Sequence, residues 1–97
     1  MKRELMLRRI KEGKLEKYLE MHANYWPELK EEMLEGGFSD ITCFVDGLNL
    51  YVFRAFDEKV MESKGKDHFK HNARWAKEMQ DLLEPVCVSC KEVFHLG

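Results

Sequence analysis

The sequence lacks any apolar run near the roughly 18 residues that a membrane-spanning helix requires, and no hydrophobic segment follows Met1. It also lacks an excess of one charge. Its 16 basic and 18 acidic residues are interspersed and leave a net charge of −2, so no basic face is offered to nucleic acid. Three cysteines, an odd number, argue against a secreted disulfide framework and for a reducing compartment. We therefore expect a cytoplasmic protein that binds neither membrane nor nucleic acid.

The chain is short, and its composition is that of an ordinary globular protein. It has 97 residues, of which 44% are hydrophobic and 35% charged, without an internal repeat or linker. These features predict a single domain over residues 1–97. A domain of this size buries only about two-thirds of the surface of its unfolded chain. A second copy could cover apolar surface that one copy leaves exposed.

Helical spacing begins at Lys14 and continues for about twenty residues. The apolar and aromatic positions of this stripe are Leu15, Tyr18, Leu19, His22, Tyr25, Trp26, Leu29 and Met33. Pro27 has no N–H to donate, so it either kinks this helix or lies in the first turn of a second one. Gly36 and Gly37 have the chemistry of a helix end. The charged run 28–35 is expected to be a solvated helix face.

A second amphipathic helix is predicted from Asp67 to about Glu84. Its buried positions would be Phe69, Trp75, Met79, Leu82 and Leu83. Pro85 is expected to end it. His68 and His71, near its start, are expected at the surface. The preceding segment, 57–66, is charged and turn-like, with room for one helical turn.

Three regions have the composition of β-structure. Residues 5–10 form a short apolar run bounded by charge, which predicts a first strand, although a helix is possible at this length. Asp46-Gly47 separates two β-prone runs, 38–45 and 48–56, and such a pair is the strongest short-range signal for a hairpin. Residues 91–96 are expected to form the last strand.

The hairpin predicts which side chains share a face. If Asp46 and Gly47 are the two turn residues, Val45 pairs with Leu48. One face then carries Ile41, Cys43, Val45, Leu48, Leu50, Val52 and Arg54. The other carries Thr42, Phe44, Asn49, Tyr51 and Phe53. Both faces are largely apolar, so both need cover.

The order of these elements is β-α-β-β-α-β. This is the α+β ferredoxin-like arrangement, a four-stranded antiparallel sheet with its helices on one face. The bare face of the sheet, which holds Phe44, Tyr51 and Phe53, must be buried in another way. Packing two such sheets across a twofold axis would bury it, and we therefore expect a homodimer.

Several motifs along the chain together resemble one known family. They are Tyr18, His22, Trp26-Pro27-Glu28-Leu29, the Asp46 hairpin, Trp75 with Met79, and the closing segment 92–96. In this order they resemble the L-rhamnose mutarotase family over nearly the whole chain, and His-x3-Trp-Pro-Glu-Leu is their most specific part. The resemblance implies a dimeric ferredoxin-like α+β barrel. It also implies an isomerase that interconverts the α and β anomers of L-rhamnose or a related monosaccharide, without metal or organic cofactor.

The resemblance also implies site residues. The catalytic histidine of the family, described as the proton donor, falls on His22, and a substrate-binding tyrosine one turn earlier falls on Tyr18. A further binding tyrosine of the family falls on Ile41, which has no hydroxyl. The family's Trp-Trp pair falls on Trp75 and Ala76, so only its first member is kept. We expect these two departures to change the preference for the sugar.

Mutarotation is chemistry that a small acid–base site can perform. The ring oxygen gains a proton and the anomeric hydroxyl loses one, and a histidine that titrates near about pH 6.5 can serve as acid or base. Tyr18 and His22, at i and i+4, bring their polar tips to one place on the stripe that faces the sheet. A water-filled sugar pocket would satisfy both tips. The plainer alternative for His22 is a helix histidine whose hydrogen bond is already made.

Other residues in this region also have two interpretations. Trp75 is either a core residue or a stacking surface for a sugar ring. Arg54 lies on the aliphatic face of the hairpin, where it could bind sugar hydroxyls or a carboxylate, or instead reach an acid such as Asp57. Trp26 is expected to be structural and to hold the break at Pro27.

The spacing Cys87-x2-Cys90 is that of some metal sites. Zinc needs four ligands, however, and only Cys43 and His95 could complete the set. We therefore expect neither a metal nor an organic cofactor. The alternative to a mutarotase is a dimeric α+β barrel that binds a small ligand without catalysis. His22 discriminates between the two, because a binding protein needs no titratable group at that position.

Overall fold

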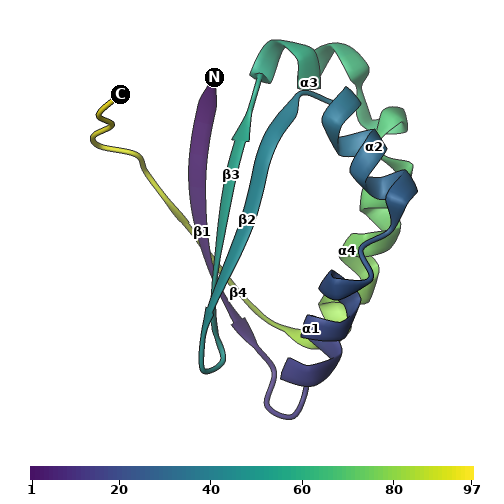
Figure 1. Ribbon diagram of the computed structural model, residues 1–97, viewed down its shortest axis with the longest axis vertical. Coiled ribbons are helices and arrows are strands. Elements are labelled where there is room, and N and C mark those ends of the chain that lie inside the picture. The colour runs from purple at the N-terminus through teal and green to yellow at the C-terminus, as the bar shows by residue number, and fades with distance from the viewer.

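Figure 1 shows the computed structural model of the chain, which describes residues 1–97. Its strands are β1 (Lys2–Ile10), β2 (Phe38–Asp46), β3 (Asn49–Phe56) and β4 (Leu83–Cys90). Its helices are α1 (Leu15–Ala23), α2 (Pro27–Glu35), α3 (Glu58–Lys64) and α4 (Lys70–Leu82), with a 3-10 turn, η1 (Lys66–His68), before α4. The predicted β-α-β-β-α-β order is confirmed, with the first helical region divided in two.

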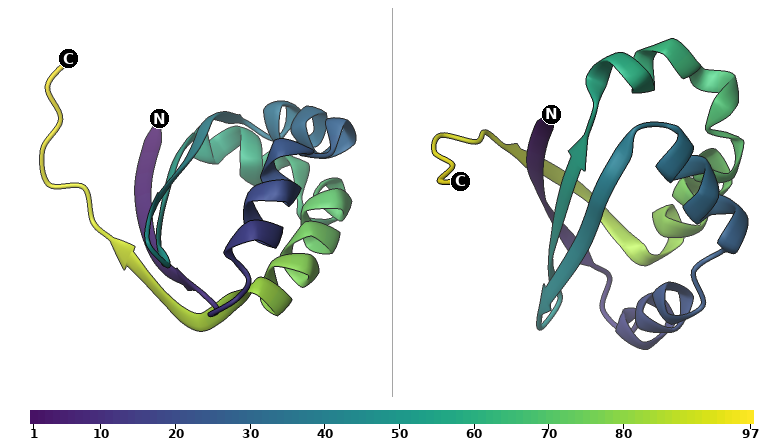
Figure 2. Two further views of the ribbon diagram at one scale, coloured as in Figure 1. Left: turned by 60° about the horizontal axis from the view of Figure 1, so that its bottom comes forward. Right: turned by 45° about the horizontal axis from the view of Figure 1, so that its top comes forward.

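The four strands form one antiparallel sheet in the order β2-β3-β1-β4. The helices cover one face of this sheet, and the other face carries no helix (Figure 1). This is the predicted ferredoxin-like fold. The two further views in Figure 2 show the last residues of the chain running away from the sheet. No helix of the chain is both long and apolar enough to cross a membrane.

Pro27 begins a second helix rather than kinking the first. It occupies the first turn of α2, where its missing N–H has no intrahelical partner to lose. At the other end of α2, the N–H of Gly36 donates to the carbonyl of Glu32 over 2.9 Å. A Cβ on Gly36 would lie 2.5 Å from the ring of Phe69, so a larger residue there would require that ring to move. Gly37 follows with a positive φ of 98°. The predicted helix end is confirmed.

The hairpin turn is shifted from its predicted position. Val45 pairs with Leu50 and Asp46 with Asn49, so the turn residues are Gly47 and Leu48. Gly47, with φ 62°, takes the first central position, where a type II′ turn needs a positive φ. Each residue of β2 therefore pairs with a residue of β3 that is two positions later than predicted. Because side chains alternate with period two, the predicted faces are unchanged.

The last third of the chain differs most from the prediction. The final strand is Leu83–Cys90, not residues 91–96, which have no regular structure. Pro85 does not end α4, which stops at Leu82, but lies inside β4. An edge strand tolerates proline because one side of its backbone needs no partner, and β4 pairs only with β1. The two cysteines of the CxxC are three residues apart in this strand, so they lie on opposite faces of the sheet.

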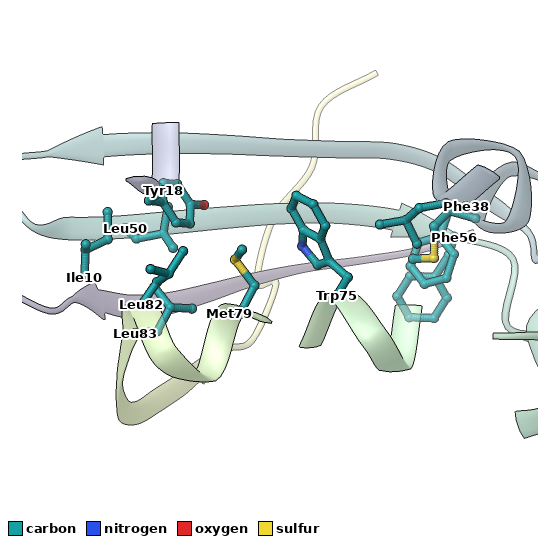
Figure 3. Packing of buried hydrophobic residues seen from close by; sticks show 11 residues of the cluster. Ile10, Tyr18, Phe38, Leu50, Phe56, Trp75, Met79, Leu82 and Leu83 are labelled. Carbon is teal, nitrogen blue, oxygen red and sulfur yellow. The ribbon is translucent and has the colours of Figure 1, made fainter. Parts of the chain in front are cut away.

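The core lies between the helices and the sheet. Figure 3 shows Trp75, Met79 and Leu82 projecting from α4 toward the strands. The buried cluster comprises Ile10, Tyr18, Leu29, Met33, Phe38, Leu50, Phe56, Trp75, Met79, Leu82 and Leu83. Ile10 and Leu29 are fully buried, and burial of one such side chain contributes about 1.5–3 kcal/mol. Of the positions predicted as buried in the second helical region, only Phe69 is half-exposed.

The charged run 28–35 is not wholly solvated, because Glu32 is only 7% exposed. Its carboxylate accepts hydrogen bonds from the backbone N–H groups of His71 (2.9 Å) and Asn72 (2.8 Å), in the first turn of α4. Nε2 of His68 lies 2.9 Å from the Glu32 carbonyl oxygen. His68 and His71 are therefore half-buried, against our expectation of surface positions. The reason is that α4 packs its N-terminus directly on α2.

Candidate active site

A pocket of about 820 Å³ lies between the sheet and the helices. Fourteen of its 22 lining residues are hydrophobic, which suits the apolar faces of a small organic ligand. All six residues singled out in the sequence line this pocket: Tyr18, His22, Ile41, Arg54, Trp75 and Ala76. They come from α1, β2, β3 and α4, so the fold brings together positions that are far apart in the chain. A smaller hollow between α2 and α4, of about 410 Å³, has no hydrophobic lining residue.

Helix α1 places Tyr18 and His22 one turn apart, with their ring centroids separated by 4.1 Å. Nδ1 of His22 lies 2.8 Å from the carbonyl oxygen of Tyr18. Because a carbonyl oxygen only accepts, Nδ1 carries the proton in the neutral ring and Nε2 carries a free lone pair. Nε2 makes no hydrogen bond within the chain. The alternative of a helix histidine with its hydrogen bond already made therefore holds for Nδ1 only. Nε2 remains available to a ligand.

Burial lowers the pKa of His22, and the hydrogen bond to the Tyr18 carbonyl opposes this to a smaller extent. The charged ring loses hydration that the half-buried site does not replace. At neutral pH the ring is therefore mainly uncharged. In this state Nε2 can accept a proton from a ligand hydroxyl.

Tyr18 lines the pocket and is only 2% exposed. Burial is the main cause that raises the pKa of Tyr18. The neighbouring Cys43 thiol raises it further, while the positive charge of Arg8 acts in the opposite direction. Burial also raises the pKa of Cys43. The phenol therefore keeps its proton at neutral pH and can donate a hydrogen bond to a ligand.

An aromatic group surrounds Trp75, which is 8% exposed. Its ring packs edge-to-face against His22, Tyr25 and Trp26, with centroid distances of 5.1, 4.9 and 5.0 Å. Such contacts hold the indole in one orientation. Trp26 does not line the pocket but packs behind Trp75, with Arg74 over its ring. Trp75 thus belongs to the core and also lines the pocket.

Tyr25 lines the pocket but was not among the residues we singled out. A signal for it was present, because Tyr25 is three residues after His22 on the same helical stripe. Its location after the end of α1 turns the ring onto Trp75. Arg8, Asp40 and Asn72 also line the pocket, and no local sequence pattern marks them.

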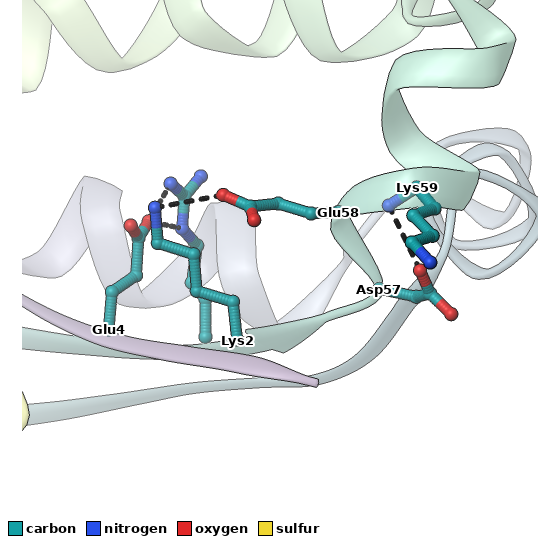
Figure 4. A network of polar contacts seen from close by, with 6 residues as sticks. Lys2, Glu4, Asp57, Glu58 and Lys59 are labelled. Carbon is teal, nitrogen blue, oxygen red and sulfur yellow. Dashed lines mark hydrogen bonds and ion pairs between the residues drawn. The ribbon is translucent and has the colours of Figure 1, made fainter.

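Arg54 lines the pocket, but its charge already has a partner. It is directly opposite Glu4 in the register of β3 and β1, and its Nε donates to the Glu4 carboxylate over 2.7 Å, with a second hydrogen bond from Nη2. The alternative prediction that Arg54 reaches Asp57 is therefore wrong. Figure 4 shows the Asp57 carboxylate instead at the backbone of Lys59, where it caps α3. Arg54 also lies over the rings of Phe38 and Phe56.

Comparisons with known proteins agree with one another. A sequence model described as L-rhamnose mutarotase matches residues 3–96. An L-rhamnose mutarotase from Lachnoclostridium phytofermentans is 35% identical over 88% of each chain. The crystal structure of an L-rhamnose mutarotase from Formosa agariphila superposes with a TM-score of 0.76 and 23% identity over the whole of both chains. A dimeric ferredoxin-like protein from an uncultured marine organism superposes with a TM-score of 0.63 and 13% identity, over 98% of this chain and 94% of that chain. At these identities, the two structures are similar in fold.

Proposed function

This chain belongs to the L-rhamnose mutarotase family and is therefore an isomerase, and we propose that it interconverts the α and β anomers of L-rhamnose or a related monosaccharide in the pocket described above. His22 is the proton donor to the ring oxygen of the sugar. The observation that carries this proposal is the free Nε2 of His22, in a pocket that is also lined by Tyr18 and Trp75. The chemistry consists of proton transfers and the cleavage of one C–O bond. It therefore needs neither a metal nor an organic cofactor.

One histidine can perform both proton transfers, because the anomeric and ring oxygens are bonded to the same carbon. The neutral ring of His22 first accepts the proton of the anomeric hydroxyl at Nε2. The C1–ring oxygen bond then breaks, a carbonyl forms at C1, and the imidazolium donates the proton to the departing ring oxygen. After rotation about C1–C2, the same transfers run in reverse on the other face of the carbonyl. Atoms and protons balance over the cycle.

The electrostatics of the pocket support this order of steps. A His22 that is mainly neutral can accept the first proton, and the lowered pKa makes its imidazolium a stronger acid for the second transfer. The Tyr18 phenol, which stays protonated, donates a hydrogen bond to a sugar oxygen one helical turn away. The face of Trp75 or Tyr25 packs on the apolar face of the sugar ring.

The proposal includes a homodimer that packs through the bare face of the sheet. A row of apolar side chains crosses all four strands on that face, formed by Phe44, Tyr51, Leu7 and Val88 in register. Phe44 is 60% and Val88 49% exposed in the single chain. Large contiguous apolar surface of this kind is rarely left in water. A strictly monomeric protein in sedimentation at low concentration would contradict the dimer.

The test of the proposal is His22→Asn, with His95→Asn in the exposed last segment as the matched control. Saturation-transfer NMR measures anomer exchange directly on L-rhamnose, L-fucose and uronic acids. We expect His22→Asn to lose about 10²–10⁴-fold in the catalysed rate while it stays folded, and His95→Asn to keep the full rate. The wild-type rate should also fall as the pH is lowered through the depressed pKa of His22, because the neutral ring is lost.

Two results would contradict the assigned role. One is exchange by His22→Asn at the wild-type rate. The other is binding of a sugar by the wild-type protein without any catalysed exchange, which would favour a non-catalytic ligand-binding barrel instead.

A further inference from the structure

We propose that Arg8 binds an anionic group at C6 of the sugar, a carboxylate or a phosphate, and that the preferred substrates are therefore acidic monosaccharides. This inference rests on the proposed mutarotase function and adds the substrate class. It concerns a residue that none of the motifs in the sequence points to.

Arg8 lies on the face of β1 that is turned toward the helices. It is opposite Leu50 of β3 and Cys87 of β4, it is half-buried, and it lines the pocket together with His22 and Tyr18. Its positive charge lies close enough to the Tyr18 phenol to favour the ionised form of that group. Arg8 is therefore close to Tyr18 in the lining of the pocket.

Two main-chain carbonyls hold the guanidinium in place. Nε of Arg8 donates to the carbonyl of Val86 over 3.0 Å, and Nη2 donates to that of Glu84 over 3.3 Å. Both carbonyls flank Pro85, where the register between β1 and β4 is irregular. The other terminal nitrogen, Nη1, makes no hydrogen bond within the chain. Arg8 is thus oriented by two bonds and retains free donors.

No carboxylate neutralises Arg8. The ion pairs of the chain are Lys2–Glu58, Arg3–Glu92, Lys17–Glu20 and Arg54–Glu4. Arg54, the other arginine of the pocket, is compensated by Glu4. Asp40 is the only acidic residue that lines the pocket, and Lys30 lines it as well, so these two opposite charges offset each other in the lining. Main-chain carbonyls satisfy donors but carry no net charge, so Arg8 leaves the pocket with a positive charge to be matched by the ligand.

The position of an acidic group at C6 suits the mechanism. C6 is bonded to C5, and C5 is bonded to the ring oxygen, which His22 protonates. A group at C6 is therefore close to the reacting centre. If the anomeric carbon lies at His22 and C6 points toward the preceding turn of α1, an anion at C6 meets Tyr18 from α1 and Arg8 from β1. A planar guanidinium can bind either a carboxylate or a phosphate through charge-assisted hydrogen bonds.

The competing explanation is that Arg8 is purely structural and only satisfies the carbonyls at the irregularity of β4. The variants Arg8→Gln and Arg8→Lys separate the two. Arg8→Gln keeps a hydrogen-bond donor and removes the charge, and Arg8→Lys keeps the charge. Lys77→Gln is the control, because it removes one exposed positive charge from α4 at a position that does not line the pocket.

The experiment measures anomer exchange by saturation-transfer NMR on L-rhamnose and on gluco, galacto and manno hexoses. Each hexose is supplied as the neutral sugar, the uronic acid and the 6-phosphate. We expect the wild-type protein to prefer an acidic form over its neutral parent. Arg8→Gln should reduce that preference by about tenfold to a hundredfold, Arg8→Lys should keep part of it, and Lys77→Gln should keep all of it. The uronate and phosphate arms identify which anion is bound.

The inference is overturned if the wild-type protein prefers neutral sugars, including L-rhamnose. It is also overturned if Arg8→Gln lowers the melting temperature but leaves the ratio of acidic to neutral rates unchanged, which is the result of a structural role. Exchange on L-rhamnose alone would refute the acidic substrate and leave the mutarotase intact. Absence of catalysed exchange on every sugar would refute the proposed function itself.

Discussion

Glu32 joins two helices, and its removal should be one of the most costly single changes to a charged residue of this chain. The side chain rises from α2, is 7% exposed, and accepts from the backbone N–H groups of His71 and Asn72 over 2.9 and 2.8 Å. These N–H groups are in the first turn of α4, where no helical carbonyl is available to them. In Glu32→Ala both lose their acceptor, and α4 loses a negative charge at its positive end.

The expected loss follows from these contacts. A hydrogen bond to a charged group contributes about 1.5–3 kcal/mol, and loss of a side-chain helix cap typically costs about 0.5–2 kcal/mol. Water reaches part of this region once the side chain is removed, so we expect about 2–3 kcal/mol for Glu32→Ala. Because about 1 kcal/mol shifts the melting temperature of a domain this small by roughly 4–8 °C, the loss is readily measured. Glu32→Gln keeps one acceptor oxygen and should lose about half as much.

Thermal and urea unfolding measure this effect, with Glu31→Ala as the control on the exposed side of the same helix. The control should change the free energy of unfolding by less than about 0.5 kcal/mol. Since α4 also carries Trp75 and Ala76 of the pocket, Glu32→Ala should weaken sugar binding more than Glu31→Ala does. Equal stability of the two variants would refute the reasoning, and the hydrogen bonds to α4 would then contribute nothing measurable.

Two further predictions concern the pocket. Tyr18→Phe keeps the buried ring and removes the hydroxyl. Sugar binding, measured by NMR titration, should therefore weaken by about 0.5–1.5 kcal/mol, while the melting temperature stays almost unchanged. A large loss of stability with unaltered binding would make Tyr18 a core residue only. The double change Ile41→Tyr with Ala76→Trp fills space on two walls of the pocket and should raise exchange on L-rhamnose relative to L-fucose and uronic acids. If the unmodified protein already prefers L-rhamnose by a wide margin, these two positions do not touch the sugar.

The periodicity of apolar residues correctly predicted which side chains share a face, even where the position of a turn was predicted wrongly. The hairpin turn was placed one residue too early, yet Ile41 and Arg54 are on the predicted face, because a displacement by two residues preserves the alternation of a strand. Likewise, the stripe of α1 and α2 continues across the break at Pro27. Both helices pack on the same side of the sheet, so Tyr18 and Leu29 both enter the core.

Contacts between distant strands were not predictable in the same way. The partner of Arg54 is Glu4, 50 residues away in the sequence, and their meeting depends on the register of β1 with β3. Asp57 was the nearest acid in sequence, but it begins α3 and its carboxylate accepts from the backbone there. The buried position of Glu32 has the same cause. A charged run has no periodic signal to mark which of its members a second helix will cover.

Pro85 connects the largest error in the fold prediction to the chemistry of the pocket. Because Pro85 was interpreted as the end of a helix, the last strand was predicted only at residues 91–96. Placed in an edge strand, the same proline is tolerated and coincides with an irregular register, since Ile10 pairs with Leu83 but Arg8 with Cys87. The carbonyls on either side of Pro85 are then free to accept from Arg8. The guanidinium is held at the pocket by these carbonyls without a neutralising carboxylate. The positive charge that we propose the substrate matches therefore depends on a backbone irregularity that no side-chain pattern encodes.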